Sequence, residues 1–148
     1  MPVNPELLGR TFPPTAPYLV GREKVREFAR AVFADDPQHT DPEVARSLGY
    51  ADVVAPPTFA IIMQELTLQQ LLAEPDSGIV LSHVLHAEQR FAYSRPIVAG
   101  DELTAALTVT GLRTIGGNAM VTSEAAITDA AGAHVATATS ILLVGEGE

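Results

Sequence analysis

Residues 58–73 read TFAIIMQELTLQQLLA, and their large apolar side chains are spread around much of a helical surface. The segment follows Pro56 and Pro57, which favour a break in the chain just before a helix. A helix that is apolar on most sides is stable only when it is largely buried. We therefore expect residues 58–73 to form a long helix in the core of the protein.

Strand patterns follow this helix. Four stretches have strand character, at residues 80–93, 102–113, 119–129 and 133–144. Turn-forming residues separate them at hairpin intervals, so the last three strands should form an antiparallel meander. Wrapping the sheet round the long helix is the most economical way to bury both apolar surfaces. The predicted fold class is α+β with one dominant core.

The first third of the chain is expected to be helical and rich in loops. Residues 22–33 place apolar side chains on one face of a helix. Residues 41–49 predict a second helix of about two turns, with Asp41 as its cap and Gly49 at its end. The chain has 148 residues, no internal repeat and no long linker, so we predict a single domain over residues 1–148.

The composition argues against several classes of function. A formal net charge of −9 repels nucleic-acid phosphates, and no cluster of Lys and Arg offsets it. The longest apolar run, residues 59–63, is far shorter than the roughly 20 residues that cross a bilayer. The chain has no cysteine, which removes disulfides and thiol catalysis. Residues 1–5 do not resemble a secretory signal, so a cytoplasmic location is expected.

Three stretches together resemble a known family: DDPQHTDP at residues 35–42, VAPPTF at 54–59 and FAYSRPIVAGD at 91–101. Their order and spacing are similar to those of the MaoC-like dehydratases and hydratases. The opening GRTF at residues 9–12, with VGREK at 20–24, resembles more narrowly the actinobacterial N-terminal dehydratase subfamily, which includes substrate-binding subunits of (3R)-hydroxyacyl-ACP dehydratases. The resemblance implies a hot-dog fold and a dimer with acyl-thioester sites near the subunit interface.

The resemblance also indicates which residues would act. Active members of the family carry a Gly-Asp-x-Asn-Pro-x-His stretch, whose Asp and His are the acid/base pair. Here His39 falls at the His position, Phe33 at the Gly position and Ala34 at the Asp position. An alanine cannot transfer a proton, which leaves Asp35 and Asp36 as the nearest carboxylates. The candidate catalytic residues are therefore His39, Asp36 and Asp35.

A second departure from the family pattern lies at the start of the long helix. Active members have a His-Gly pair there, and the glycine amide points at the thioester oxygen. This chain has Pro56 and Pro57, and Pro57 has no amide hydrogen, although the next two amides remain. The candidate substrate-binding residues lie at this end of the helix: Pro57, Thr58, Phe59, Ile62 and Met63.

We interpret the chain as the weakly or non-catalytic, substrate-binding subunit of a (3R)-hydroxyacyl-ACP or -CoA dehydratase of fatty-acid metabolism, in a heterodimer with a catalytic MaoC-like chain. One alternative is a self-sufficient homodimeric (R)-specific enoyl-CoA hydratase that uses His39 with Asp35 or Asp36. Another is an acyl-binding module without chemistry. No cofactor is expected, and His83, His86 and Glu88 lack a further ligand at useful spacing, so no metal site is predicted.

Overall fold

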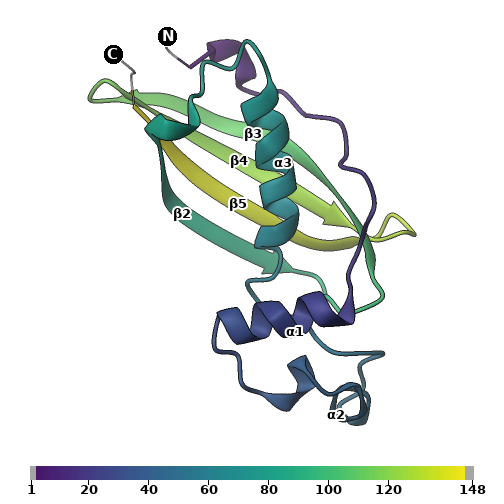
Figure 1. Cartoon of the computed structure of the whole chain (residues 1–148). Helices are drawn as coiled ribbons and strands as arrows, with labels where there is room; N and C mark the ends of the chain where they lie inside the picture. The colour runs from purple at the N-terminus through teal and green to yellow at the C-terminus, as the bar shows by residue number, and fades with distance from the viewer. Residues whose placement is uncertain (1–2, 146–148) are drawn as a thin grey trace.

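The computed structural model describes residues 3–145, so residues 1–2 and 146–148 of the predicted single domain lie outside the described part. The long helix α3 (Ile61–Ala73) lies across the concave face of a curled antiparallel sheet of five strands (Figure 1). Helices α1 (Arg22–Ala31) and α2 (Pro42–Ser47) lie beyond one end of α3. The predicted α+β hot-dog architecture, a central helix wrapped by a sheet, is confirmed.

The sheet has the order β1-β3-β4-β5-β2, and every neighbouring pair is antiparallel. Its strands are β1 (Tyr18–Leu19), β2 (Val84–Tyr93), β3 (Glu102–Ile115), β4 (Asn118–Thr128) and β5 (His134–Val144). Strands β3, β4 and β5 form the predicted meander. Gly116 and Gly117 make the two-residue turn between β3 and β4, where their positive φ angles of 54° and 83° suit glycine. Strands β1 and β2 are the two edges of the sheet.

Several element boundaries differ from those expected from the sequence. The predicted helix over residues 58–73 begins only at Ile61, because residues 57–60 form a turn. The predicted strand over residues 80–93 begins at Val84, after a 3₁₀ turn, η3 (Leu81–His83). Two further 3₁₀ turns are η1 (Pro5–Leu7) and η2 (Pro37–His39). No helix of the described residues has the length and apolar content needed to cross a bilayer.

The core between α3 and the sheet has two hydrophobic clusters. One packs around the first half of α3 and includes Phe59, Met63 and Ile127. The other packs around the second half and includes Leu71 and Leu107. Four buried polar side chains fall between the two clusters along the helix and strands: Gln64, Thr67, Ser123 and Ser140. A layer of buried polar side chains therefore separates the two apolar clusters of the core.

Candidate functional site

A hollow of about 510 Å³ contains the predicted histidine. It lies between the η2 turn, the segment that leads into α3, and the end of β2 with the loop that follows it. Its lining includes Asp36, His39, Pro57, Tyr93 and Arg95. We call it the His39 hollow. These five residues come from segments that are far apart in the sequence, and the fold brings them to one place.

The η2 turn is positioned by the end of α1. The Phe33 amide bonds to the Arg30 carbonyl at 3.3 Å and the Ala34 amide to the Ala29 carbonyl at 2.8 Å. This is a Schellman arrangement, in which one residue past the helix takes a left-handed conformation. Phe33 is that residue, with a φ of 58°. The reversal ends the predicted helix at Ala31 and turns the chain toward η2.

His39 is held in one orientation. Its side chain is buried, with 7% of the residue exposed, and its Nδ1 lies 2.6 Å from the carbonyl oxygen of Val54. A carbonyl oxygen can only accept a hydrogen bond, so Nδ1 carries the hydrogen. In the neutral imidazole, Nε2 is then free to accept a proton or a hydrogen bond. His39 can therefore act through Nε2 as a base or as an acceptor for a ligand hydroxyl.

The two candidate carboxylates differ in position. Both residues are exposed, but Asp36 lines the His39 hollow and Asp35 lies outside it. The Asp36 carbonyl accepts the His39 amide at 3.1 Å, which keeps the two residues together across η2. Ala34, at the position where the resemblance expects the catalytic carboxylate, offers only a methyl group. Of the predicted catalytic residues, the fold brings together His39 and Asp36.

The amides at the start of α3 are largely taken by internal partners. The Phe59 amide donates to the Pro56 carbonyl at 2.9 Å, and the Ala60 amide donates to the Tyr93 hydroxyl at 3.3 Å. The Tyr93 hydroxyl in turn donates to the Pro57 carbonyl at 2.5 Å. Burial raises the pKa of the Tyr93 phenol, so the phenol stays protonated and able to donate near neutral pH. Thr58 is exposed, and its amide is the one at this turn that can meet a ligand.

Arg95 joins the hollow to the sheet. Its guanidinium binds both carboxylate oxygens of Asp101, at 2.8 and 3.1 Å, and one oxygen of Asp129 at 3.2 Å. The pKa of Arg95 is raised, chiefly by the hydrogen bond to Asp101. The pKa of Asp129 is lowered, first by the Ala133 amide and then by Arg95. With two carboxylates on one guanidinium, this cluster has no spare positive charge for an anionic carrier.

A second and larger hollow, of about 780 Å³, adjoins the first; we call it the β2 groove. Its walls come from α1, the turn before α3, the start of α3, and β2, and they include Phe28, Thr58, Ile61, Gln89 and Phe91. Phe91 and Tyr93 are alternate residues of β2, with ring centroids 6.4 Å apart. Tyr93 lines the His39 hollow and Phe91 lines the groove, so these two rings lie at the boundary between the two hollows.

The predicted substrate-binding residues are divided among three places. Pro57 lines the His39 hollow and Thr58 lines the β2 groove. Phe59 and Met63 are fully buried in the first hydrophobic cluster and line neither hollow. Ile62 is partly buried and packs against the same cluster.

The sequence did not single out Tyr93 or Gln89. The alternation of side chains along β2 predicts that the two residues lie on the same face of the strand. No local pattern predicts which residue of the turn or of α3 each of them hydrogen-bonds.

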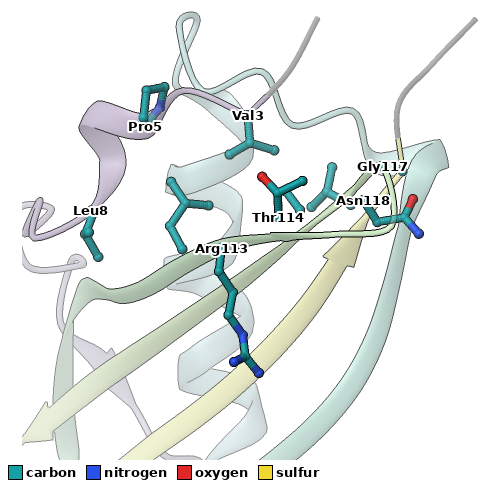
Figure 2. A pocket seen from close by; sticks show the side chains of 11 residues that line it. Val3, Pro5, Leu8, Arg113, Thr114, Gly117 and Asn118 are labelled. Atoms are coloured by element: carbon teal, nitrogen blue, oxygen red, sulfur yellow. The ribbon is translucent and has the colours of Figure 1, made fainter.

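A third hollow, of about 220 Å³, lies at the opposite end of the molecule, between η1 and the turn from β3 to β4 (Figure 2). Val3, Pro5 and Asn118 are among its lining residues. Arg113 is the ionisable residue of its lining, and its side chain extends away from Val3 and Pro5 (Figure 2). Within residues 3–145, no three His, Asp or Glu side chains come together in a way that could hold a metal ion. We therefore take the His39 hollow and the β2 groove as the candidate site.

Comparison with known proteins identifies the family. The model of the FAS1-like dehydratase domain region matches residues 6–138. A UPF0336 protein from Clavibacter michiganensis subsp. michiganensis is 67% identical over 144 residues, which is 97% of this chain and 97% of that protein. A UPF0336 protein from Leifsonia xyli subsp. xyli is 59% identical over the same shares of the two chains.

Solved structures agree with this assignment. A MaoC-like dehydratase superposes with a TM-score of 0.86 at 37% identity, over 95% of this chain and 42% of that longer chain. A chain of the HadBC (3R)-hydroxyacyl-ACP dehydratase complex from Mycobacterium tuberculosis superposes with a TM-score of 0.83 at 33% identity, over 93% of this chain and 96% of that chain. This protein therefore belongs to the family of FAS1-like dehydratase domain regions, and its relatives within that family include UPF0336 proteins.

Proposed function

We propose that this chain is the substrate-binding subunit of a 3-hydroxyacyl thioester dehydratase and works beside a catalytic chain of the same fold. Elimination of water needs a base, an acid and a donor to the thioester oxygen. The observation that supports the proposal best is the incomplete set of these groups in the His39 hollow. Ala34 has no ionisable group, and the Phe59 and Ala60 amides already have partners.

The β2 groove suits the acyl chain. Its wall contains Phe28, Val32, Ile61 and Phe91, and its volume lies in the range of roughly 300–1,000 Å³ that is usual for small-molecule sites. The adjoining His39 hollow would then receive the thioester and its 3-hydroxyl group, within reach of the free Nε2 of His39. An apolar groove beside a polar hollow matches a ligand with an apolar tail and a polar head.

A partner chain is suggested by the edge of the sheet. Among the described residues, β2 pairs with β5 on one side and with no strand on the other. Apolar side chains near this edge are exposed, with 70% of Leu85 and 43% of Val32 accessible. The HadBC protein, which this chain resembles at 33% identity, is a complex. We infer that a catalytic MaoC-like chain covers this edge and completes the site.

The test measures the hydration of crotonyl-CoA by this chain alone, by a catalytic MaoC-like chain alone, and by the two after co-expression. We expect this chain alone to be slower than the complex by about 10²–10⁴-fold, the usual effect of a missing general acid or base. His39→Ala in this chain should weaken substrate binding by the complex and leave its kcat nearly unchanged. Full activity of the purified chain by itself would refute the proposal.

One observation favours a second candidate, a self-sufficient hydratase. Asp36 and His39 line the same hollow, so the carboxylate could supply the proton-transfer group that Ala34 lacks. In that case the chain alone is active, and Asp36→Asn or His39→Ala lowers its kcat by about 10²–10⁴-fold. Asp35→Asn is the matched control, because Asp35 is exposed like Asp36 but lies outside the hollow. Equal losses from Asp35→Asn and Asp36→Asn would exclude a specific role for Asp36.

A further inference from the structure

A layer of polar side chains crosses the protein between α3 and the sheet. Gln64 and Thr67 project from α3 into the core and are fully buried. On the sheet, Gln89 of β2 is the register partner of Ser140 of β5, and Ser140 is the register partner of Ser123 of β4. The two serine hydroxyls bond to each other at 3.1 Å, and the Thr67 hydroxyl donates to the Gln64 carbonyl at 2.6 Å. These three residues are therefore satisfied.

The two glutamines of this layer are not fully satisfied. Gln89 Nε2 donates to Gln64 Oε1, which joins β2 to α3. Among the described residues, Gln64 Nε2 and Gln89 Oε1 are buried and have no hydrogen-bond partner. Exchanging nitrogen and oxygen in both amides leaves one bond and the same number of unpaired atoms. A buried unpaired amide destabilises a fold, so stability alone does not account for this pair.

Gln89 lines the β2 groove, and Gln64 is fully buried behind it. Gln89 and Phe91 are the partly buried β2 residues of the groove, whereas the other β2 residues that line it are exposed. From Tyr93, at the boundary with the His39 hollow, to Gln89 is four residues of strand, or about 13 Å. Beyond the pair, toward the end of α3, the second hydrophobic cluster fills the core. Gln89 lines the groove and Gln64 does not, so their hydrogen bond joins the groove wall to the buried face of α3 between the two hydrophobic clusters.

We propose that the Gln64–Gln89 bridge is the floor of the acyl pocket and limits the length of the acyl chain that this subunit accepts. The inference rests on the proposed function, because it takes the β2 groove as the acyl site. An alkyl chain has no donor or acceptor, so it cannot replace the hydrogen bond it would have to break in passing the bridge. Its terminal carbons stop there, and chains that reach past the bridge gain nothing from their extra carbons.

The test measures binding of saturated acyl-CoA thioesters, which do not react, to the full-length chain in its co-expressed complex with a catalytic MaoC-like chain, by titration calorimetry. The series is butanoyl-, octanoyl- and hexadecanoyl-CoA. Each methylene that enters an apolar pocket strengthens binding about fourfold. We expect octanoyl-CoA to bind more tightly than butanoyl-CoA, and hexadecanoyl-CoA to bind no more tightly than octanoyl-CoA. Gln64→Ala removes the α3 half of the floor and should strengthen hexadecanoyl-CoA binding at least about tenfold relative to octanoyl-CoA.

Three further variants make the result specific. Gln64→Leu removes the hydrogen bond but keeps most of the bulk of the side chain, so it should relax the length limit less than Gln64→Ala does. Gln89→Ala opens the floor from β2 and should have the effect that we expect of Gln64→Ala. It tests the inference independently if Gln64→Ala does not fold. Gln70→Ala is the matched control, because Gln70 is on the same helix but donates to the Pro13 carbonyl and lies outside the groove. It should leave the preference unchanged.

Two results would overturn the inference, and they differ from each other. If Gln64→Ala and Gln89→Ala bind octanoyl-CoA like the wild type and show no gain for hexadecanoyl-CoA, the bridge is not the floor, and the proposed function stands. If no acyl-CoA of any length binds to the wild type or to any variant, the acyl site itself is wrong, and the floor and the proposed function fall together.

Discussion

Phe33 adopts a conformation that its side chain disfavours. It is the left-handed residue after α1, with a φ of 58°, and 85% of it is exposed, so packing of its ring offsets little of the cost of the conformation. A residue with a Cβ atom pays about 1–2 kcal/mol for this conformation, whereas glycine adopts it freely. Glycine also loses more entropy on folding, by roughly 0.5–1 kcal/mol. We therefore predict that Phe33→Gly raises the free energy of unfolding by up to about 1 kcal/mol in urea titrations.

Phe33→Ala separates the two properties of this residue. Alanine keeps the Cβ atom and the conformational strain but removes the exposed ring, so we expect no gain in stability from it. If alanine stabilises the protein as much as glycine does, the ring is responsible and the strain argument is wrong.

The family pattern has glycine at this position, so Phe33→Gly also tests whether the glycine conformation alone restores activity. Ala34 would still lack an ionisable group, and we expect no restored hydration of crotonyl-CoA.

At the scale of elements, Asp52 ties both short helices to the segment that enters the site. Its carboxylate binds the Arg22 guanidinium at the start of α1 with distances of 2.7 and 3.0 Å, lies 3.9 Å from Arg46 of α2, and accepts the Val53 amide at 2.7 Å. The hydrogen bond from Arg22 is the main cause that lowers the pKa of Asp52 to about 2. A carboxylate whose pKa is lower in the folded state stabilises the fold fully at pH values above its unfolded-state pKa of about 3.9. This stabilisation is lost as the pH falls through the folded-state pKa.

We therefore predict a pH-dependent effect of Asp52→Asn. The difference in urea midpoint between the wild type and the variant should be constant above pH of about 5 and should shrink between pH of about 4 and about 2. Repeating the comparison in an Arg22→Gln background removes the chief partner, and the pH dependence of the difference should largely disappear. A difference that stays the same down to pH of about 2 in the wild-type background would show that the ion pair does not set this pKa.

Some helices, strands and contacts could be predicted from the sequence, and others could not. Local patterns gave the meander and α3 because strand alternation, turn glycines and apolar content are read within a few residues. They placed the start of α3 at residue 58 and not at Ile61, because the Ala60 amide in the preceding turn is bound by the Tyr93 hydroxyl, 33 residues away, and not by a neighbouring side chain. The Gln89 bond to Gln64 spans 25 residues. His39 was found from a family motif, but its partner Val54 was not, because a backbone carbonyl leaves no pattern in the sequence.

At the scale of the whole molecule, the sheet has two edges that differ in their surroundings. Strand β1 has two residues, whereas β2 has ten and adjoins the groove that we assign to the acyl chain. A long edge strand with exposed apolar side chains is a template for pairing with another chain. Both edges carry a comparably exposed leucine, Leu85 on β2 at 70% and Leu19 on β1 at 67%. This pair allows the two edges to be compared with the same substitution.

We predict that Leu85→Glu prevents association with a catalytic MaoC-like chain and that Leu19→Glu does not. Both changes put a charge on an exposed position, so both variants should fold, which thermal unfolding of each chain alone would verify. A charge buried in the interface without a partner should weaken the complex at least tenfold, or about 1.4 kcal/mol, in a calorimetric titration of the two chains. Loss of the complex with Leu19→Glu but not with Leu85→Glu would place the partner on the β1 edge. The partner would then be unable to contribute groups directly to the β2 groove, and this chain would have to supply every contact that its acyl ligand makes there.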